Sequence, residues 1–452
     1  MNLTKLRQAA EAIARCAIRA VDPGALIRQA VKLSGNRLTI GENSVDLDRF
    51  KRILVVGAGK AGAPMAGALE EILGDRITGG AVVVKDGHAK PLRRIRVFEA
   101  RHPVPDLRGL HAARAIVSLL EQYARADTLA LCVISGGGSA LMPFPRDPVS
   151  LQDKQETTSL LLRCGASIDE TNAVRKHISK IKGGQLAQAV GPARLECLIL
   201  SDVVGDKLDI IASGPAVGDP STFSDCKEIL DRYKIWQTAP QSVRETIERG
   251  VRGEIHETPK PGSRVFGNVR NVIIGNNRTA LEAASAEASS LGFHPLILSA
   301  CISGEAKDVG TVLASIALEV VASSNPAPPP LCIIAGGETT VTVRGTGKGG
   351  RNQELALSAS LKLTSASDIV VAGVGTDGTD GPTDAAGAIV DVTTVERART
   401  QGLDPVDYLN RNDSYNLLQA SLEQDHPQQI YYCGRRPNTG VHVVSRQQES
   451  QN

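Results

Sequence analysis

The sequence predicts an α/β protein of two domains with a doubly wound arrangement of strands and helices. Its 452 residues exceed the roughly 250 to 300 residues at which one hydrophobic core stops growing, so two domains are expected. Short apolar runs recur along the chain without polar alternation, which is typical of strands buried on both faces of a parallel sheet. Helix-like segments lie between these runs, and the β, α, β, α alternation predicts the doubly wound architecture.

The expected elements follow from this pattern. Apolar runs predict strands at residues 53–56, 81–84, 129–134, 195–200, 272–274, 296–298, 331–334 and 369–371. Helices are expected to include residues 110–123, 280–291 and 312–322. Near the N-terminus, apolar side chains at helical spacing predict an amphipathic docking helix rather than a secretion signal: Leu6, Ala9, Ala10, Ile13 and Ala17.

One internal stretch, residues 249–268, predicts the domain boundary. It holds several Gly and Pro residues and has weak periodicity, as linkers do. We therefore expect an N-terminal domain over residues 1–255 and a C-terminal domain over residues 265–452. A second Pro-rich break at residues 323–330 lies too close to the next strand to be a linker, and it predicts a rigid loop.

Composition excludes several classes of partner. Lys and Arg total 51 against 49 Asp and Glu, and aromatic residues make up 3%, so the chain lacks the positive field and the stacking surface that nucleic acids need. No run reaches the roughly 18 apolar residues of a membrane span. The eight cysteines are scattered and form no C-x-x-C pair, which indicates reduced thiols and a cytoplasmic protein.

A first glycine turn follows the strand predicted at residues 53–56, with Gly57, Gly59 and Gly62 in G-x-G-x-x-G spacing. A strand, a glycine turn and a helix in this order favour phosphate binding, because the helix N-terminus offers N–H groups and a partial positive charge. Lys60 adds a full charge suited to a β- or γ-phosphate, which favours a kinase over a dinucleotide enzyme. The alternative is that the glycines only let helix and strand pack closely.

A second glycine turn follows residues 129–134, with Gly136, Gly137, Gly138 and Ser139 before a short helix. In a parallel sheet both turns would face one crevice at the carboxyl ends of the strands, where open α/β sheets bind ligands. A purely structural turn with Ser139 as a helix cap is the alternative. Upstream, the segment RHPVPD is interpreted as a rigid loop first and a substrate contact second.

Basic residues gather between Asn172 and Lys182. On a continuous helix, Arg175 and Lys182 would fall near one face and Lys176 and Lys180 on another, so only part of this charge can point inward. A solvated basic helix is the alternative interpretation.

Carboxylates follow three of the predicted strands. Asp202 and Asp206 come after residues 195–200, Glu338 after residues 331–334, and Asp377, Asp380 and Asp384 lie among glycines after residues 369–371. Such carboxylates suit Mg²⁺, which prefers one or two protein carboxylates together with nucleotide phosphates. Ordinary turn formation is the alternative, because Asp and Gly are common turn residues.

Seven segments occur in a fixed order from about residue 50 to about residue 415: VVGAGKAG, SGGGSAL, VRKHISKIKGGQLA, LSDVVGD, ASGPAVGDPSTF, GGETTVTVRGTGKGGRNQELAL and GTDGTDGPTDAAGAIVD. Together they resemble the glycerate 2-kinases whose C-terminal half carries the motif named MOFRL. The resemblance implies an N-terminal Rossmann-like domain with a doubly wound parallel sheet and a C-terminal mixed-sheet α/β domain. It also implies an active site in the cleft between them.

The sixth of these segments predicts a β-hairpin-like excursion, a glycine-rich loop with Lys348, Gly349 and Gly350, and a helix from about Asn352. Arg351 would lie near the N-terminus of that helix. A guanidinium there can hold a phosphate or carboxylate bidentately, and the helix dipole assists it. The resemblance supports both Lys60 and Arg351 as essential residues.

The resemblance implies that ATP phosphorylates the 2-hydroxyl of D-glycerate with the help of Mg²⁺. We expect Lys60 and Arg351 to bind anionic oxygens and Asp202 to orient or deprotonate the attacking hydroxyl. Nucleotide contacts are expected at the glycines of both turns, Ser139, Lys348, Gly349, Gly350 and Asp377, and metal contacts at Asp206, Glu338 and Asp380. The oligomeric state is open, and a homodimer is one option.

Two alternative functions also fit parts of the sequence. An NAD(P)-dependent hydroxypyruvate reductase would use the first glycine turn for a dinucleotide, with Asp86 at the ribose. A catalytically weak sensor of sugar acids or nucleotides is suggested by the tail. There Thr439 and Gly440 keep the family pattern T-G-x-T-x-T-N-V-x-D, but His442 replaces its Asn.

Overall fold

The computed structural model describes residues 2–363, 368–421 and, for the backbone, 440–446. The chain forms two compact units. The N-terminal unit is one continuous segment, Pro23–Ile274. The C-terminal unit combines Met1–Asp22 with Gly275–Asn452.

This division differs from the predicted one in two places. Residues 1–22 belong to the C-terminal unit, and the N-terminal unit continues through the Gly- and Pro-containing stretch that was expected to be the linker. That stretch is packed against its own unit: the Thr258 hydroxyl donates to the buried carboxylate of Asp219, 2.9 Å away, and the Asp219 N–H donates to the Pro259 carbonyl at 2.9 Å. Gly and Pro therefore shape a structural loop here.

The N-terminal unit contains a six-stranded sheet in the order β6-β5-β4-β7-β8-β9. Its strands are β4 (Arg52–Ala58), β5 (Gly79–Lys85), β6 (Ile95–Ala100), β7 (Thr128–Ile134), β8 (Arg194–Leu200) and β9 (Val269–Gly275). The pairings from β6 to β8 are parallel. Chain order reverses direction between β4 and β7, which is the switch point of a Rossmann sheet. The predicted doubly wound parallel sheet is confirmed.

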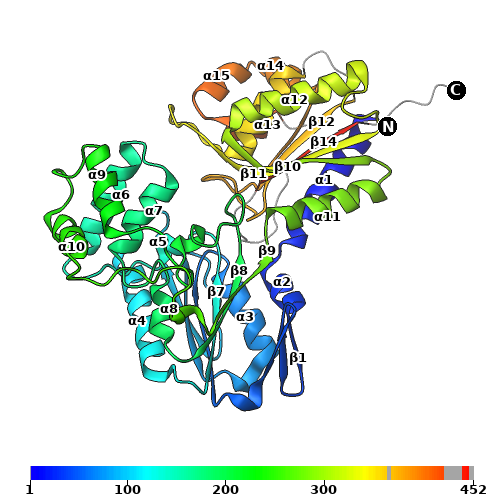
Figure 1. Cartoon of the computed structure of the whole chain (residues 1–452). Coiled ribbons are helices and arrows are strands. Elements are labelled where there is room, and N and C mark those ends of the chain that lie inside the picture. Colours follow the sequence, from blue (N-terminus) through cyan, green and yellow to red (C-terminus); the bar gives the residue numbers. More distant parts are fainter. Residues whose placement is uncertain (1, 364–367, 422–439, 447–452) are drawn as a thin grey trace. The chain divides into compact units, whose positions relative to one another are not determined.

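Helices cover both faces of this sheet (Figure 1). The helices of the N-terminal unit are α2 (Pro23–Ala30), α3 (Gly62–Leu73), α4 (Leu107–Tyr123), α5 (Gly138–Leu141), α6 (Leu151–Arg163), α7 (Ile168–His177), α8 (Gln185–Val190), α9 (Phe223–Arg232) and α10 (Gln241–Val251). A small antiparallel sheet, β1 (Val31–Ser34), β2 (Arg37–Ile40) and β3 (Asn43–Asp46), precedes the main one.

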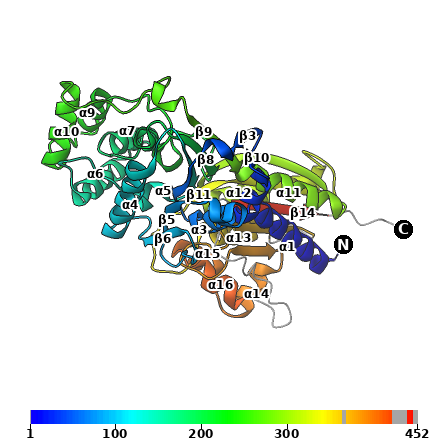
Figure 2. The ribbon, with the colours of Figure 1, turned by 90° about the horizontal axis from the view of Figure 1, so that it is seen from below.

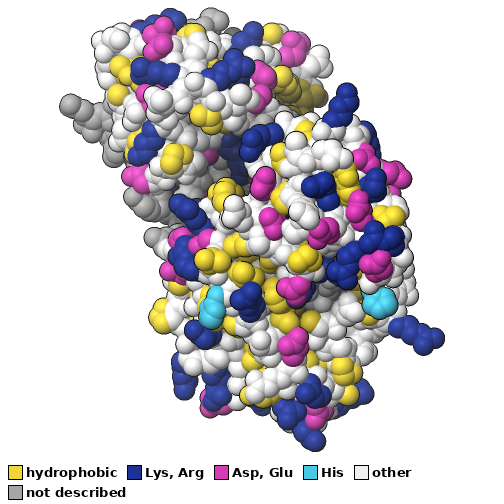
Figure 3. All heavy atoms as spheres, turned by 90° about the vertical axis from the view of Figure 1, so that its left-hand side faces the viewer, with side chains coloured by type: hydrophobic (Ala, Val, Ile, Leu, Met, Phe, Trp, Pro, Cys, Tyr) yellow, Lys and Arg dark blue, Asp and Glu magenta, His cyan; other side chains and the backbone are white. Residues whose placement is uncertain are grey.

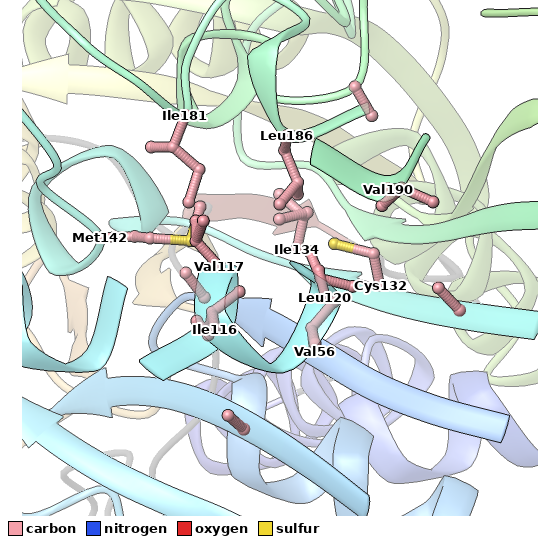
Figure 4. Close-up of a cluster of buried hydrophobic side chains, with 14 of the residues drawn as sticks. Val56, Ile116, Val117, Leu120, Cys132, Ile134, Met142, Ile181, Leu186 and Val190 are labelled. Atoms are coloured by element: carbon pink, nitrogen blue, oxygen red, sulfur yellow. The ribbon is translucent and has the colours of Figure 1, made fainter. Parts of the chain in front are cut away.

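The main core of this unit lies between the sheet and the helices α4 and α8. Figure 4 shows side chains of Ile116, Leu120, Leu186 and Val190 meeting those of Cys132 and Ile134 on β7. Every residue of β7 is buried, as expected for a central strand of a parallel sheet covered on both faces.

A second apolar cluster joins α6, α7, α9 and α10, which lie together in both views of the ribbon (Figures 1 and 2). Phe223 and Val243 are fully buried at its centre. This helical group fixes the position of α7, whose last turn carries Arg175.

The C-terminal unit contains a five-stranded mixed sheet in the order β10-β11-β14-β12-β13. Its strands are β10 (His294–Glu305), β11 (Leu331–Thr340), β12 (Val370–Gly375), β13 (Gly387–Asp391) and β14 (Gly440–Arg446). Strands β10 and β11 are parallel, and the other pairings are antiparallel. The predicted mixed sheet is confirmed. Each predicted apolar run lies within a strand, except that Ile369 comes one residue before β12.

The helices of the C-terminal unit are α1 (Leu3–Ala20), α11 (Asn277–Ser290), α12 (Ala306–Ser323), α13 (Arg351–Lys362), α14 (Thr394–Thr400), α15 (Pro405–Asn410) and α16 (Ser414–Ala420). The predicted helices correspond to α4, α11 and α12. Strand β14 forms between β11 and β12 although the sequence near it departs from the family pattern. Thr439, which keeps that pattern, lies outside the described residues.

Helix α1 docks far from its sequence neighbours, beside α11 and β14 (Figures 1 and 2). Its buried face includes Leu6, Ala10 and Ile13, as the apolar spacing predicted. The Arg7 guanidinium also donates to the Asp391 carboxylate, which is fully buried at the end of β13. The docking helix is therefore confirmed, and it joins the unit formed by the other end of the chain.

On the face drawn in Figure 3, Lys and Arg side chains are interspersed with Asp and Glu. This mixture agrees with a formal net charge of +2. No helix in the described part of the chain is long and apolar enough to cross a membrane.

Candidate active site

Strands β4 and β7 end level with each other, since Ala58 pairs opposite Ile134. The two glycine turns that follow are therefore neighbours at the switch point of the sheet. They are also hydrogen-bonded to each other: the Lys60 N–H donates to the Gly136 carbonyl at 2.9 Å, and the Ala61 N–H donates to the Ser135 hydroxyl at 3.0 Å. The sequence prediction that both turns lie at one edge is confirmed.

The N–H groups of the first turn are hydrogen-bonded within the protein. Besides those of Lys60 and Ala61, the Gly59 N–H donates to Val83 and the Gly62 N–H to Gly59. Each of these four N–H groups already has a protein acceptor, so the expected phosphate cradle at Gly57, Gly59 and Gly62 has little donor capacity left. The glycines instead allow close packing, because a β-carbon on Gly57 would lie 2.0 Å from the Val133 carbonyl oxygen. The packing alternative is favoured here.

Lys60 is only 8% exposed and lies along the second turn, with its Cγ 3.5 Å from where a β-carbon of Gly137 would be. His102 lies against the same glycine. Burial lowers the pKa of His102 to about 4, and the charges of Lys60 and Lys85 add to this effect. His102 is thus a neutral imidazole at pH 7, and the RHPVPD loop contributes a side chain to the site.

The second turn, Gly136 to Ser139, is the part of the site with unused donors. Gly137 has a φ of +82°, a conformation that favours glycine. The N–H groups of Gly136, Gly137 and Ser139 have no acceptor within the described part of the chain. The Asp202 carboxylate lies directly against this turn, since a β-carbon on Gly136 would come within 2.0 Å of its Oδ2. The structure thus brings together Lys60, the second turn and Asp202.

The basic segment is not one continuous helix. Helix α7 ends at His177, and Lys180 and Lys182 lie in the following loop. Lys180 is partly exposed and pairs with Asp147, whereas Lys182 is fully buried and donates to the Ser139 carbonyl at 2.7 Å. Lys176 is also buried, and its ammonium lies 3.4 Å from the Asp219 carboxylate.

Asp206 lies beyond Asp202 in the loop after β8. Its backbone has a φ of +53°, its N–H donates to the Val203 carbonyl at 3.0 Å, and its side chain is partly exposed. The carboxylate remains a candidate metal ligand.

In the C-terminal unit, Arg351 is the first residue of α13, as predicted. Its Nη1 lies 2.9 Å from Oε1 of Glu338 on β11. Both side chains are partly exposed. The pair therefore presents one fixed guanidinium at the N-terminus of a helix, where an anionic group is also favoured by the helix dipole.

The loop before α13 has no hairpin: residues 341–350 contain no strand. The loop is held instead by two side chains that follow α15. The Asn412 side-chain oxygen accepts from the N–H groups of Arg344 and Gly345, and the Asp413 carboxylate accepts from the Lys348 N–H at 2.8 Å. Contact with Asp413 thus takes the place of hairpin pairing. Only a glycine fits at position 347, because a β-carbon there would lie 2.4 Å from the β-carbon of Asp413.

Lys348, Gly349 and Gly350 lie directly before Arg351. The Lys348 ammonium lies 4.3 Å from the centre of the Tyr415 ring, a cation–π distance. Asp377, after β12, is partly exposed, and its carboxylate accepts from the Thr379 N–H at 3.1 Å. These groups remain candidates for contacts with a nucleotide.

Asp380 has a different role from the predicted one. It is buried, and its two carboxylate oxygens accept from the N–H groups of Asn352 and Gln353 and from the Asn352 side-chain amide. It therefore caps α13 from a neighbouring turn. Because both oxygens are occupied and no edge of the carboxylate faces solvent, Asp380 does not fit the expected metal ligand.

The residues described by the structure contain no group of three His, Cys, Asp or Glu side chains placed to hold a metal ion. Mg²⁺ in nucleotide enzymes typically needs only one or two protein carboxylates, with phosphates and water completing its shell. Within the N-terminal unit the partly exposed Asp206, and within the C-terminal unit the partly exposed Glu338, each supply one such carboxylate.

Local sequence patterns did not predict two groups of residues that matter here. Lys154 on α6 is 2% exposed and donates to the Arg175 carbonyl, but an isolated Lys on an amphipathic helix gives no signal of burial. Asn412 and Asp413 hold the loop before Arg351. No local pattern reports a contact between residues about 65 positions apart.

Together the two units define a class: two-domain α/β proteins in which a Rossmann sheet carries a buried Lys beside glycine turns, and a mixed sheet carries a helix-terminal Arg. Two family models match the chain, a domain of unknown function called DUF4147 over residues 9–248 and the MOFRL family over residues 331–428.

The chain is 46% identical over 403 residues to the glycerate 2-kinase of Pyrococcus horikoshii, covering 89% of each chain. It is 44% identical to the D-glycerate 2-kinase of Thermotoga maritima over 82% of this chain and 86% of that one. A crystal structure of glycerate kinase from Thermotoga maritima superposes with a TM-score of 0.83 at 38% identity, covering 98% of this chain and 100% of that chain. The chain belongs to the glycerate 2-kinase family.

Proposed function

We propose that this protein transfers the γ-phosphoryl group of ATP to the 2-hydroxyl of D-glycerate, forming 2-phosphoglycerate and ADP. The observation that carries the proposal is the 46% identity to a glycerate 2-kinase over 89% of both chains. The groups described above support the same chemistry, because phosphoryl transfer depends on positioning and on positive charge around the phosphate oxygens.

In the N-terminal unit, Lys60 supplies a buried ammonium for anionic oxygens, and Asp202 orients or deprotonates the acceptor hydroxyl. The support for this assignment is their shared position at the second glycine turn. A carboxylate beside the acceptor hydroxyl would accept its proton as the bond to phosphorus forms.

In the C-terminal unit, Arg351 is proposed to bind phosphate oxygens, with Glu338 fixing its orientation. Lys348, Gly349, Gly350 and Asp377 are proposed to contact the nucleotide. Joint action of Arg351 and Lys60 on one phosphoryl group stays a prediction.

Mg²⁺ belongs to the proposal, and Asp206 of the N-terminal unit and Glu338 of the C-terminal unit each stay a predicted ligand for it. When bound, it would neutralise charge on the β- and γ-phosphates. A cytoplasmic location is part of the same proposal, because that compartment supplies ATP. A homodimer stays a prediction, which light scattering coupled to gel filtration would test.

The reductase alternative is weakened by the first glycine turn. A dinucleotide pyrophosphate needs N–H donors at this position, and here the N–H groups from Gly59 to Gly62 are already hydrogen-bonded within the protein. The sensor alternative predicts ligand binding without turnover, so an activity assay separates it from the kinase.

The test is ADP release by the purified protein with MgATP, with and without D-glycerate. The proposal predicts release that depends on glycerate, and no oxidation of NADH or NADPH with hydroxypyruvate. Nicotinamide oxidation without ADP release would replace the kinase with the reductase, and glycerate binding without ADP release would favour the sensor.

A further inference from the structure

Three cationic side chains lie behind the second glycine turn: Lys154 on α6, Arg175 on α7 and Lys182 in the loop after α7. Lys154 is 2% exposed, Lys182 is fully buried, and Arg175 is partly buried. Within the described ranges, none of the three has a carboxylate oxygen within 4.0 Å. This separates them from Lys176, whose ammonium is close to two carboxylates.

Arg175 is held by hydrogen bonds that leave part of its guanidinium unused. Its Nη2 lies 2.5 Å from the Ser139 hydroxyl, and its Nη1 lies 3.3 Å from the side-chain oxygen of Asn172. Ser213 donates to the same Asn172 oxygen at 3.0 Å, and its hydroxyl is 2.9 Å from that of Ser139. A guanidinium has five N–H donors, so several remain for a ligand.

The two lysines fix the backbone on either side of this contact. Lys182 donates to the Ser139 carbonyl at 2.7 Å, and Lys154 donates to the Arg175 carbonyl at 3.2 Å. Burial lowers the pKa of Lys154 to about 7, and it lowers the pKa of Lys182 well below its usual value, with the charge of Arg175 adding to both effects. The lysines thus anchor the turn and the helix. Burial lowers the pKa of Arg175 only to about 10, so its guanidinium keeps its charge at neutral pH.

A largely desolvated guanidinium without a counter-charge is costly, and an anion bound beside it would supply the missing charge. Ser139 and Gly137 are partly exposed, so a ligand can reach the turn. Next to Arg175, neither the Ser139 N–H nor the Gly137 N–H has an acceptor among the residues that the structure covers. This end of the turn therefore offers a guanidinium and two N–H donors to an anion.

The other end of the same turn has the opposite character, because the Asp202 carboxylate lies against Gly136. The carboxylate there can accept a hydrogen bond from a hydroxyl. Arg175 suits an anionic group and Asp202 suits a hydroxyl, and the two side chains are separated by one tight turn. A short hydroxy acid carries both groups at such a spacing and fits this arrangement better than a nucleotide does.

We propose that Arg175, together with the Ser139 end of the turn, binds the carboxylate of the hydroxy-acid acceptor and so sets the specificity of the enzyme for acids over neutral alcohols. Lys154 and Lys182 are positioning residues for this subsite. The inference rests on the proposed glycerate kinase function and adds the group that recognises the acceptor's carboxylate.

The experiment compares the wild type with Arg175→Gln, using D-glycerate and its neutral amide, D-glyceramide, as acceptors. The variant should raise the KM for D-glycerate by about 10- to 100-fold, the usual effect of losing one hydrogen-bonded charge. The KM for MgATP should change less than about threefold, and the preference for glycerate over glyceramide in kcat/KM should fall by a similar factor of about 10 to 100. Arg146→Gln is the matched control, because Arg146 is another partly buried Arg of this unit, bonded to Gln185.

If the KM for MgATP rises as much as the KM for D-glycerate, or more, the subsite binds nucleotide phosphate and the proposal is overturned. An unchanged preference for glycerate over glyceramide would also overturn it. If Arg175→Gln fails to fold, Ser139→Ala gives the second test, with a smaller rise confined to the KM for glycerate.

Thermal stabilisation of the wild type by D-glycerate alone, lost in the variant, tests the subsite without turnover. A wild type that binds glycerate but releases no ADP would therefore refute the kinase function while leaving the subsite standing. A wild type that turns over but keeps its acid preference in the variant would refute only the subsite.

Discussion

The guanidinium of Arg351 and the carboxylate of Glu338 are 2.9 Å apart, at the point where the first turn of α13 meets β11. The Arg351 guanidinium also lies near the Thr339 carbonyl, with Nη1 at 3.5 Å from its oxygen. These contacts hold a long, flexible side chain in one orientation before any ligand arrives. Phosphoryl transfer requires pre-organised charge of this kind, because the side chain then stabilises the transition state without first having to change its conformation.

Replacing Arg351 by Lys keeps the charge but removes the planar fork. We expect kcat/KM to fall by about 100- to 1,000-fold, the loss typical of one aligned donor to the developing charge. Steady-state kinetics with MgATP and D-glycerate measure the effect. Arg278→Lys, at an exposed position of α11 where the side chain pairs with Glu282, is the matched control, and equal losses in both variants would contradict the assignment.

Lys60→Met should abolish turnover while leaving the fold intact. The aliphatic part of Lys60 packs beside Gly137 and would be replaced closely by Met, so only the ammonium is removed. We expect a loss of at least about 1,000-fold in kcat and an unchanged circular dichroism spectrum. Lys90→Met, on an exposed loop of the same unit, should keep wild-type activity. Substantial turnover by Lys60→Met would remove Lys60 from the active site.

Asp380 should make stability depend on pH between about 4 and 6. Burial raises its pKa to about 6, and the hydrogen bonds from Gln353 and Asn352 only partly oppose this. A carboxyl whose folded pKa is raised stabilises the fold fully below its unfolded pKa of 3.8, and this contribution is lost as the pH rises through about 6. Asp380→Asn, neutral at every pH, should flatten this part of the curve in urea unfolding, at a cost of about 1 kcal/mol for the lost acceptor.

Because Asp380 caps the helix that begins with Arg351, the same variant should also lower activity, although Asp380 touches no ligand in this account. A variant with full activity and an unchanged pH profile would show that the cap has no influence on Arg351.

Glu257 should stabilise the N-terminal unit at neutral pH. Burial alone would raise its pKa, but hydrogen bonds from His177, from the Phe223 N–H and from Lys260 outweigh burial and lower it to about 2. A lowered carboxyl pKa contributes stability above the unfolded value of 4.5, and this is lost as the pH falls through about 2. Glu257→Gln should therefore cost about 1 kcal/mol at pH 7 after allowance for solvent screening, and the difference from the wild type should shrink steadily below pH 4.5. A constant difference across this range would point to packing instead.

Much of the fold was predictable because its signals are local. Each apolar run lacks polar alternation, and a strand buried on both faces requires that pattern. The level ends of β4 and β7 then follow from parallel pairing, so the neighbouring positions of Lys60 and Gly136 could also be expected. The place of Arg351 at the start of α13 followed from the glycines before it and the helical pattern after it.

The errors arose where one local pattern serves two purposes. An Asp in a glycine-rich turn has the same sequence appearance whether it binds a metal or, like Asp380, caps a helix 28 residues away in sequence. The G-x-G-x-x-G spacing likewise does not reveal that the N–H of Lys60 is already bonded to the neighbouring turn. Helix α1 joins the C-terminal unit through long-range packing and the pair between Arg7 and Asp391, which no window of sequence contains.

Product identity tests the central claim most directly. Phosphorus NMR of the reaction with MgATP and D-glycerate should show ADP and the resonance of 2-phosphoglycerate, formed by the wild type and not by Lys60→Met. A folded wild type that yields only 3-phosphoglycerate, or no phosphorylated product, would contradict the proposed glycerate 2-kinase activity.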